Sequence, residues 1–178
     1  MLCTPRFQVS PALAGRVDPR LLALLGRRLR RAAQRLRVDP RAFASLGLRI
    51  VDDAEMARLH LEFMGEPGPT DVLSFTPEAP YKSDESDEFD RPGLGDLVLD
   101  WDAVERQARD RSAAALLDEA TVLLVHGLAH LHGHDHRTRA EGRAMHALER
   151  RLLRALRTPD PPRPYAPWTG GRGEGGHA

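Results

Sequence analysis

The stretch ATVLLVHGLAHL, residues 120 to 131, constrains the fold more than any other part of the chain. Its side chains are apolar in every direction around a helix, except for His126 and His130. A helix that is apolar on all sides has to be buried, so this one is predicted to be the central helix of the domain. Ser112 is a residue type that caps helix N-termini, and Gly133 is typical of a helix C-terminus. The helix is therefore predicted to begin at Ser112 and to continue up to Gly133.

The rest of the chain supplies strands and amphipathic helices that can surround this helix. Apolar runs predict strands at residues 2–9 (an edge strand, because of Pro5), 43–51, 72–75 and 96–100. Capping residues and helical periodicity predict helices after Asp18, from Asp52 to Met64, over 102–109 and over 139–157. The acidic stretch 81–93 is predicted to be an exposed hairpin loop. Because strands and helices do not alternate regularly, we predict an α+β single domain with a small mixed β-sheet packed on the central helix and surrounding helices.

Length and composition predict one domain and a tail. A chain of 178 residues suits a single domain. Residues 1–157 are predicted to form it, and residues 158–178, rich in Pro and Gly, to be a disordered tail. Cys3 is the only cysteine, which rules out an internal disulfide and a thiolate metal cluster and fits a reducing cytosol. No signal-peptide core or run of about 20 apolar residues is evident, so we expect a cytoplasmic protein without a membrane partner.

The charges of the chain balance, with 26 basic and 26 acidic residues, so overall charge neither favours nor disfavours a nucleic acid partner. Their distribution is less even, because four arginines lie opposite the apolar face of the first predicted helix: Arg20, Arg27, Arg31 and Arg35. They form either a solvated face or a stripe that contacts phosphates.

Three histidines have the spacing of a metal site. His126 and His130 are four residues apart, so they project from the same face of the helix. Gly133 lets the chain reverse, and His136 can then return to the same ion. Three neutral imidazoles leave the fourth tetrahedral position of zinc open to water, whose pKa zinc lowers to about 7. We therefore predict one Zn²⁺ ion on the central helix. The alternative is that these are core histidines without a metal.

The residue after the first histidine argues against a peptide hydrolase. Zinc proteases with this histidine spacing keep a catalytic glutamate there, and here the position is Gly127. Either the metal hydroxide acts without a protein base, or another carboxylate takes the proton. The candidate carboxylates are Asp71, Asp96 and Asp135, of which Asp71 and Asp135 are predicted to be catalytic. Asp135 can alternatively orient a ligand imidazole.

Three stretches of the chain resemble the YbeY endoribonuclease family, in the family's order. HGLAHLHGHDH at 126–136 is similar to the family signature HGxLHLxGyDH, and PTDVLSF at 69–75 and LGD at 94–96 agree as well. The resemblance implies a zinc ion held by His126, His130 and His136. It also implies a single-strand-specific endoribonuclease that acts in 3′-end maturation of 16S rRNA and in ribosome quality control. The partners that it implies are the small ribosomal subunit and a ribosome-associated GTPase.

The chain departs from the family pattern beside the turn at 65–70. His60 and Met64 stand where the family often has an asparagine and an arginine. An arginine there can hold a phosphate, and methionine cannot. The alternatives to the nuclease are therefore a non-catalytic ribosome assembly factor with a structural zinc and, disfavoured by Gly127, a metalloprotease. His132 and His134, which flank Gly133, are interpreted as spectators of the metal site.

Overall fold

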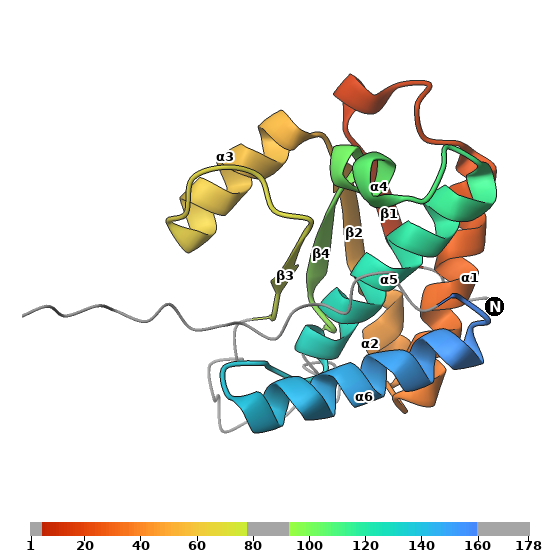
Figure 1. Cartoon of the computed structure of the whole chain (residues 1–178), viewed down its shortest axis with the longest axis vertical. Coiled ribbons are helices and arrows are strands. Elements are labelled where there is room, and N and C mark those ends of the chain that lie inside the picture. Colours follow the sequence, from red (N-terminus) through yellow and green to blue (C-terminus); the bar gives the residue numbers. More distant parts are fainter. Residues whose placement is uncertain (1–4, 78–92, 160–178) are drawn as a thin grey trace, which may run out of the picture.

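The structure, a computed structural model, describes residues 5–77 and 93–159. Four strands form one sheet in the order β1-β2-β4-β3 (Figure 1). β1, β2 and β4 run parallel and β3 is antiparallel to β4, so the sheet is mixed, as predicted. The bounds are β1 Arg6–Val9, β2 Gly47–Val51, β3 Val72–Phe75 and β4 Asp96–Asp100.

Helices surround the sheet, and their N-termini are set by side-chain caps. The carboxylates of Asp18 and Asp52 and the hydroxyl of Ser112 each accept a backbone N–H in the first turn of the helix that follows. The helices are η1 Pro11–Leu13, α1 Pro19–Arg35, α2 Pro40–Ala44, α3 Asp53–Met64, α4 Trp101–Gln107, α5 Ala113–Leu131 and α6 Arg139–Ala155. Gly133, at φ +87°, reverses the chain after α5.

One predicted strand is wrong at its start. Residues 43 and 44, predicted as strand, belong to α2. Asp39 caps that helix and Pro40 opens it, a local signal that outweighs the strand preference of the apolar residues that follow. Of the predicted strand 2–9, residues 2–4 lie outside the described residues, and β1 is an edge strand as expected. The predicted loop 81–93 and tail 158–178 also lie largely outside them.

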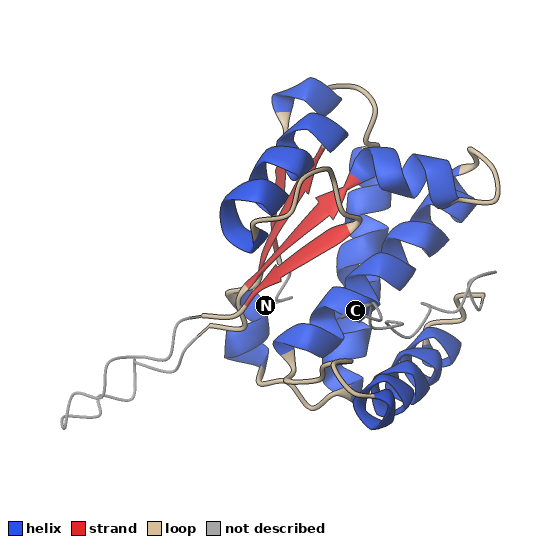
Figure 2. Cartoon of the chain, turned by 60° about the vertical axis from the view of Figure 1, so that its left-hand side comes forward, coloured by secondary structure: helices blue, strands red, loops and turns tan. Residues whose placement is uncertain are grey.

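Helices lie on both sides of the sheet (Figure 2), and a cluster of apolar side chains packs on each face. On one face, Leu48 of β2 and Leu97 of β4 pack against α1 and α5 in the main core. On the other face, Val51 and Val98 pack under α3 with Leu73 of β3. The fold is therefore an α+β domain, as predicted.

α5 is the central helix that its apolar sequence predicts. Twelve residues of α5 are buried, including His126 and Gly127. By length and composition α5 is apolar enough to cross a membrane, but 67% of its apolar window is buried inside the domain. That burial is what a core helix shows.

An acidic cluster joins the N-termini of α3 and α4. Asp53, Asp100 and Asp102 lie with carboxylate oxygens within 4.8 Å of one another. Arg16 pairs with Asp102, and Arg106 pairs with Asp53 at 2.6 Å, so two guanidinium groups balance part of this charge. Asp100 is completely buried. The cluster ties two helix ends together at the edge of the domain away from the histidines.

Candidate metal centre

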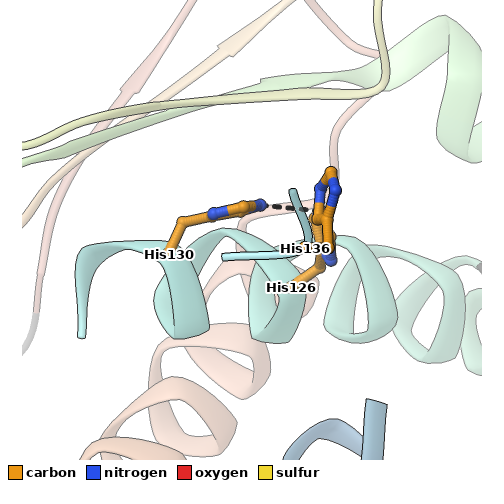
Figure 3. A group of neighbouring side chains, drawn as sticks. All are labelled: His126, His130 and His136. Atoms are coloured by element: carbon orange, nitrogen blue, oxygen red, sulfur yellow. Dashed lines mark hydrogen bonds between the residues drawn. The ribbon is translucent and has the colours of Figure 1, made fainter. Parts of the chain in front are cut away.

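The three histidines of the sequence motif meet in space (Figure 3). His126 and His130 project from the same face of α5, and the reversal at Gly133 brings His136 back beside them. The ring centroids of His126 and His130 are 4.7 Å apart, and those of His130 and His136 are 5.1 Å apart. One ring nitrogen from each residue lies within 4.8 Å of the other two. Such a group can hold one metal ion.

The spacing of the first two imidazoles fits a tetrahedral ion. The Nε2 atoms of His126 and His130 are 3.2 Å apart. Two nitrogens bound to one zinc at 2.0–2.1 Å with tetrahedral angles are separated by about 3.3 Å. Two neutral imidazoles that point lone pairs at each other repel without a cation between them. The donor set and this distance therefore suit a divalent ion.

A buried glutamate orients the first histidine. Oε1 of Glu149, on α6, accepts a hydrogen bond from Nδ1 of His126 at 2.7 Å. With the proton on Nδ1, the lone pair of Nε2 is free to face the other imidazoles. Sequence reasoning assigned this orienting role to Asp135 and missed Glu149. The signal was present, because Glu149 occupies the buried face of α6 formed by Met145, Leu148, Leu152 and Leu153.

Burial and neighbouring charge favour the neutral, ligating form of the second histidine. Burial, followed by the charges of His126 and His136, lowers the pKa of His130. Asp135 is held ionised, because the backbone N–H of His136 donates to Oδ1 at 2.8 Å and lowers the pKa of the carboxyl. Oδ2 of Asp135 pairs with Arg137 at 2.7 Å. Asp135 therefore supports His136 through its backbone.

The histidines form one wall of an open pocket of about 630 Å³. Thr70 and Ser74, from the stretch PTDVLSF, line it beside β3. Asp135 also lines it, whereas Asp71 and Asp96 are not among its described lining residues. The backbone carbonyl of Asp71 accepts a hydrogen bond from the N–H of Asp100. The pKa of Glu119 is raised mainly by burial and also by the negative charge of the Asp71 side chain. Glu119 precedes His126 by two helical turns, so Asp71 lies toward the other half of α5.

His60 faces this pocket from α3 and was not predicted as a site residue. Its Nδ1 is 2.8 Å from the carbonyl oxygen of Gly68, and its Nε2 is 3.5 Å from the carboxylate of Glu66. Donation from Nδ1–H to that carbonyl leaves Nε2 as the acceptor nitrogen of the neutral ring. Met64 lines the pocket one turn further along α3. The sequence signal for His60 as a site residue was its position, where the family often has an asparagine.

Gly127 lets α5 touch the sheet. A Cβ atom at this position would lie 2.8 Å from Leu97 and 3.3 Å from Ser74 and Val72. The hydroxyl of Ser74 also donates to the carbonyl oxygen of Gly127, at 3.4 Å. The place where a zinc protease keeps its glutamate is therefore filled by strands β3 and β4.

His132 and His134 are outside the three-histidine group formed by the described residues. Their rings stack on each other, with centroids 5.8 Å apart and planes 11° apart. His134 lines the pocket of the three histidines, and His132 lines only a second hollow beside it, which His134 also lines.

Comparisons with known protein sequences identify the family of the chain. The model of the endoribonuclease YbeY family matches residues 15–157, so the chain belongs to that family. It is 45% identical to the endoribonuclease YbeY of Alkalilimnicola ehrlichii over 112 residues, 63% of this chain and 64% of that one. It is 42% identical to the endoribonuclease YbeY of Thermobifida fusca over 114 residues, 61% of this chain and 69% of that one.

These alignments span about two thirds of the length of the relatives. The solution structure of TM1509 from Thermotoga maritima has a TM-score of 0.48 and 20% identity, over 89% of this chain and 98% of that one. That likeness is too distant to bear on function.

Proposed function

We propose that the protein is a zinc-dependent endoribonuclease that cleaves single-stranded RNA, with the 3′ end of 16S rRNA in the small ribosomal subunit as its substrate. Family membership supports the reaction class. The observation that carries the metal dependence is the group of His126, His130 and His136 on the wall of an open pocket. A cytoplasmic location and a ribosome-associated GTPase as a further partner belong to the same proposal.

The metal ion, when bound, would polarise a phosphate oxygen of the RNA as a Lewis acid. The three imidazoles would hold it, and Glu149 fixes the tautomer of His126. Two side chains of the pocket can move a proton. Asp135 is ionised beside His136, and His60 presents Nε2 from the opposite wall. We assign the role of base to Asp135 rather than to Asp71, because Asp71 does not reach the pocket wall in the described structure.

Two alternative functions fit the geometry less well. A structural zinc site closes its fourth position with a protein ligand, and no fourth described Asp, Glu, His or Cys joins the three histidines. A metalloprotease needs a base after the first histidine, where Leu97 and Ser74 leave no room for one.

Cleavage of a single-stranded rRNA 3′-end precursor by the zinc-loaded protein tests the proposal, with His130→Ala as the control. We expect cleavage that is lost in the variant. Equal cleavage by both proteins would reveal a contaminating nuclease and contradict the assignment. No cleavage by either, with zinc bound to the natural protein, would favour the assembly factor.

A further inference from the structure

A second hollow lies between the C-terminal end of α1 and α6, and we call it the α1–α6 groove. Its volume is about 830 Å³. Figure 1 shows α6 crossing near the end of α1. Its polar lining residues are Arg35 and Arg37 at the end of α1, Arg151 on α6, and His132 and His134 after α5.

The described residues that line the groove carry positive charge only. None of its described lining residues is acidic. Arg35, Arg37 and Arg151 are exposed and make no ion pair with a described residue. Some other arginines of the chain are paired: Arg28 binds Asp118 at 2.8 Å, for example. Three guanidinium groups that pair with no described carboxylate surround one hollow, and they suit an anion with several negative charges, because each planar fork can bind two phosphate oxygens.

The α1–α6 groove adjoins the histidine pocket at one shared residue. His134 lines both the groove and the histidine pocket. His132 stacks on His134, and the two nearly parallel rings offer a flat aromatic surface beside the arginines. Single-stranded nucleic acids bind to such combinations, with bases stacked on aromatic rings and phosphates on cations.

We propose that the α1–α6 groove binds the RNA strand on one side of the cleaved nucleotide. Arg35, Arg37 and Arg151 contact its phosphates, and a base stacks on the imidazole pair of His132 and His134. The strand passes around the turn between α5 and α6 to reach the metal centre. This inference rests on the proposed nuclease function, and it divides the arginines of α1: Arg35 contacts RNA, while Arg20 and Arg27 do not line the groove.

The test compares two matched triple variants. The groove variant is Arg35→Gln, Arg37→Gln and Arg151→Gln. The control variant is Arg20→Gln, Arg27→Gln and Arg143→Gln, which removes three exposed charges from the same two helices outside the groove. Fluorescence anisotropy measures binding of a 12-nucleotide 2′-O-methyl RNA, which is protected from attack by its own 2′-hydroxyl, across a salt series.

We expect the groove variant to bind at least tenfold more weakly and the control variant to bind as the natural protein does. Loss of three phosphate contacts should reduce the slope of log K against log salt by about 2, at about 0.7 per contact on single strands. His132→Ala should weaken binding without changing the slope, because it removes stacking and no charge. Natural affinity and slope in the groove variant, or equal losses in both triple variants, would overturn the proposal.

A second readout separates this inference from the nuclease assignment. A trinucleotide that fills only the histidine pocket should be cleaved by the groove variant as fast as by the natural protein. A longer RNA should be cleaved with a higher KM. If neither protein cleaves anything, the nuclease assignment fails, and the binding series still decides whether the groove holds RNA. Thermal unfolding shows whether each variant is folded. If the groove variant does not fold, the single variants Arg37→Gln and Arg151→Gln are measured in its place.

Discussion

Replacing Asp100 with Asn should remove a pH dependence of stability that comes from the acidic cluster. Oδ1 of Asp100 caps α4 by accepting the backbone N–H groups of Asp102 and Ala103 at 2.9 and 3.2 Å. Oδ2 is buried and accepts no hydrogen bond from a described N–H or O–H donor. Burial, and then hydrogen bonding to the carboxyl of Asp53, raises the pKa of Asp100 to about 7. An asparagine keeps the cap and can donate an amide N–H to Asp53.

The sign follows from proton binding. The folded pKa of about 7 lies above the ordinary value of 3.8, so the folded state binds this proton more tightly than the unfolded chain. Stability from this proton is complete below pH 3.8 and is lost as the pH rises through 7. Integration from pH 5 to pH 8 gives a loss of about 3 kcal/mol.

Urea unfolding of the natural protein and of Asp100→Asn at pH 5 and pH 8 measures this difference. Both samples contain a chelator, so that loss of metal at low pH does not contribute to the measured difference in stability. The pKa values of Asp53 and Asp102 are lowered, so their contributions are lost only below pH 4 and lie outside this range. The variant should gain stability relative to the natural protein as the pH rises. A gap in unfolding free energy that is the same at both pH values would refute the reasoning.

Three further substitutions test the metal centre. Glu149→Gln should lower zinc affinity by about 10- to 100-fold, because it weakens the hydrogen bond that orients His126; competition with a chromophoric chelator measures this, and natural affinity would contradict it. Asp135→Asn should slow RNA cleavage by about 10²- to 10⁴-fold while Asp71→Asn cleaves normally. Equal rates of the two variants in single-turnover assays would contradict the assignment of Asp135 as the base. Gly127→Glu should destabilise the fold by about 3 kcal/mol or more, because a carboxylate meets Leu97 and Val72; a folded variant with peptidase activity would contradict this.

The parts of the structure that sequence predicted well depend on local pattern. The burial of α5 and the meeting of His126, His130 and His136 follow from residues within one helix and its terminal turn. Helical phase alone sets two of the three directions, and Gly133 sets the third. The same locality explains the correct caps at Asp18 and Ser112.

The parts that sequence missed depend on packing between distant elements. Glu149 reaches His126 only because α6 lies across α5, and no local pattern places two helices against each other. Asp71 and Asp135 were indistinguishable as bases, since the choice depends on where the end of β3 lies relative to α5. The α1–α6 groove is lined by residues from the end of α1, the turn after α5 and α6, so the sequence alone does not show it. For that reason the sequence groups Arg35 with the other arginines of α1, whereas in the structure Arg35 lines the groove and Arg20 and Arg27 do not.

Because Glu149 of α6 hydrogen-bonds to His126, the metal affinity of the site depends on the position of α6. An ion bound to His126 would favour the tautomer and ring orientation that donate to Glu149, and would so add to the hydrogen bond and the apolar contacts that already hold α6 on α5. By thermodynamic reciprocity, a ligand that stabilises this position of α6 also increases the metal affinity of the site. A ligand lodged against Arg151 would do this from the far side of the same helix. If the α1–α6 groove binds RNA as proposed, binding of RNA and binding of the metal are coupled through α6 without any change of fold.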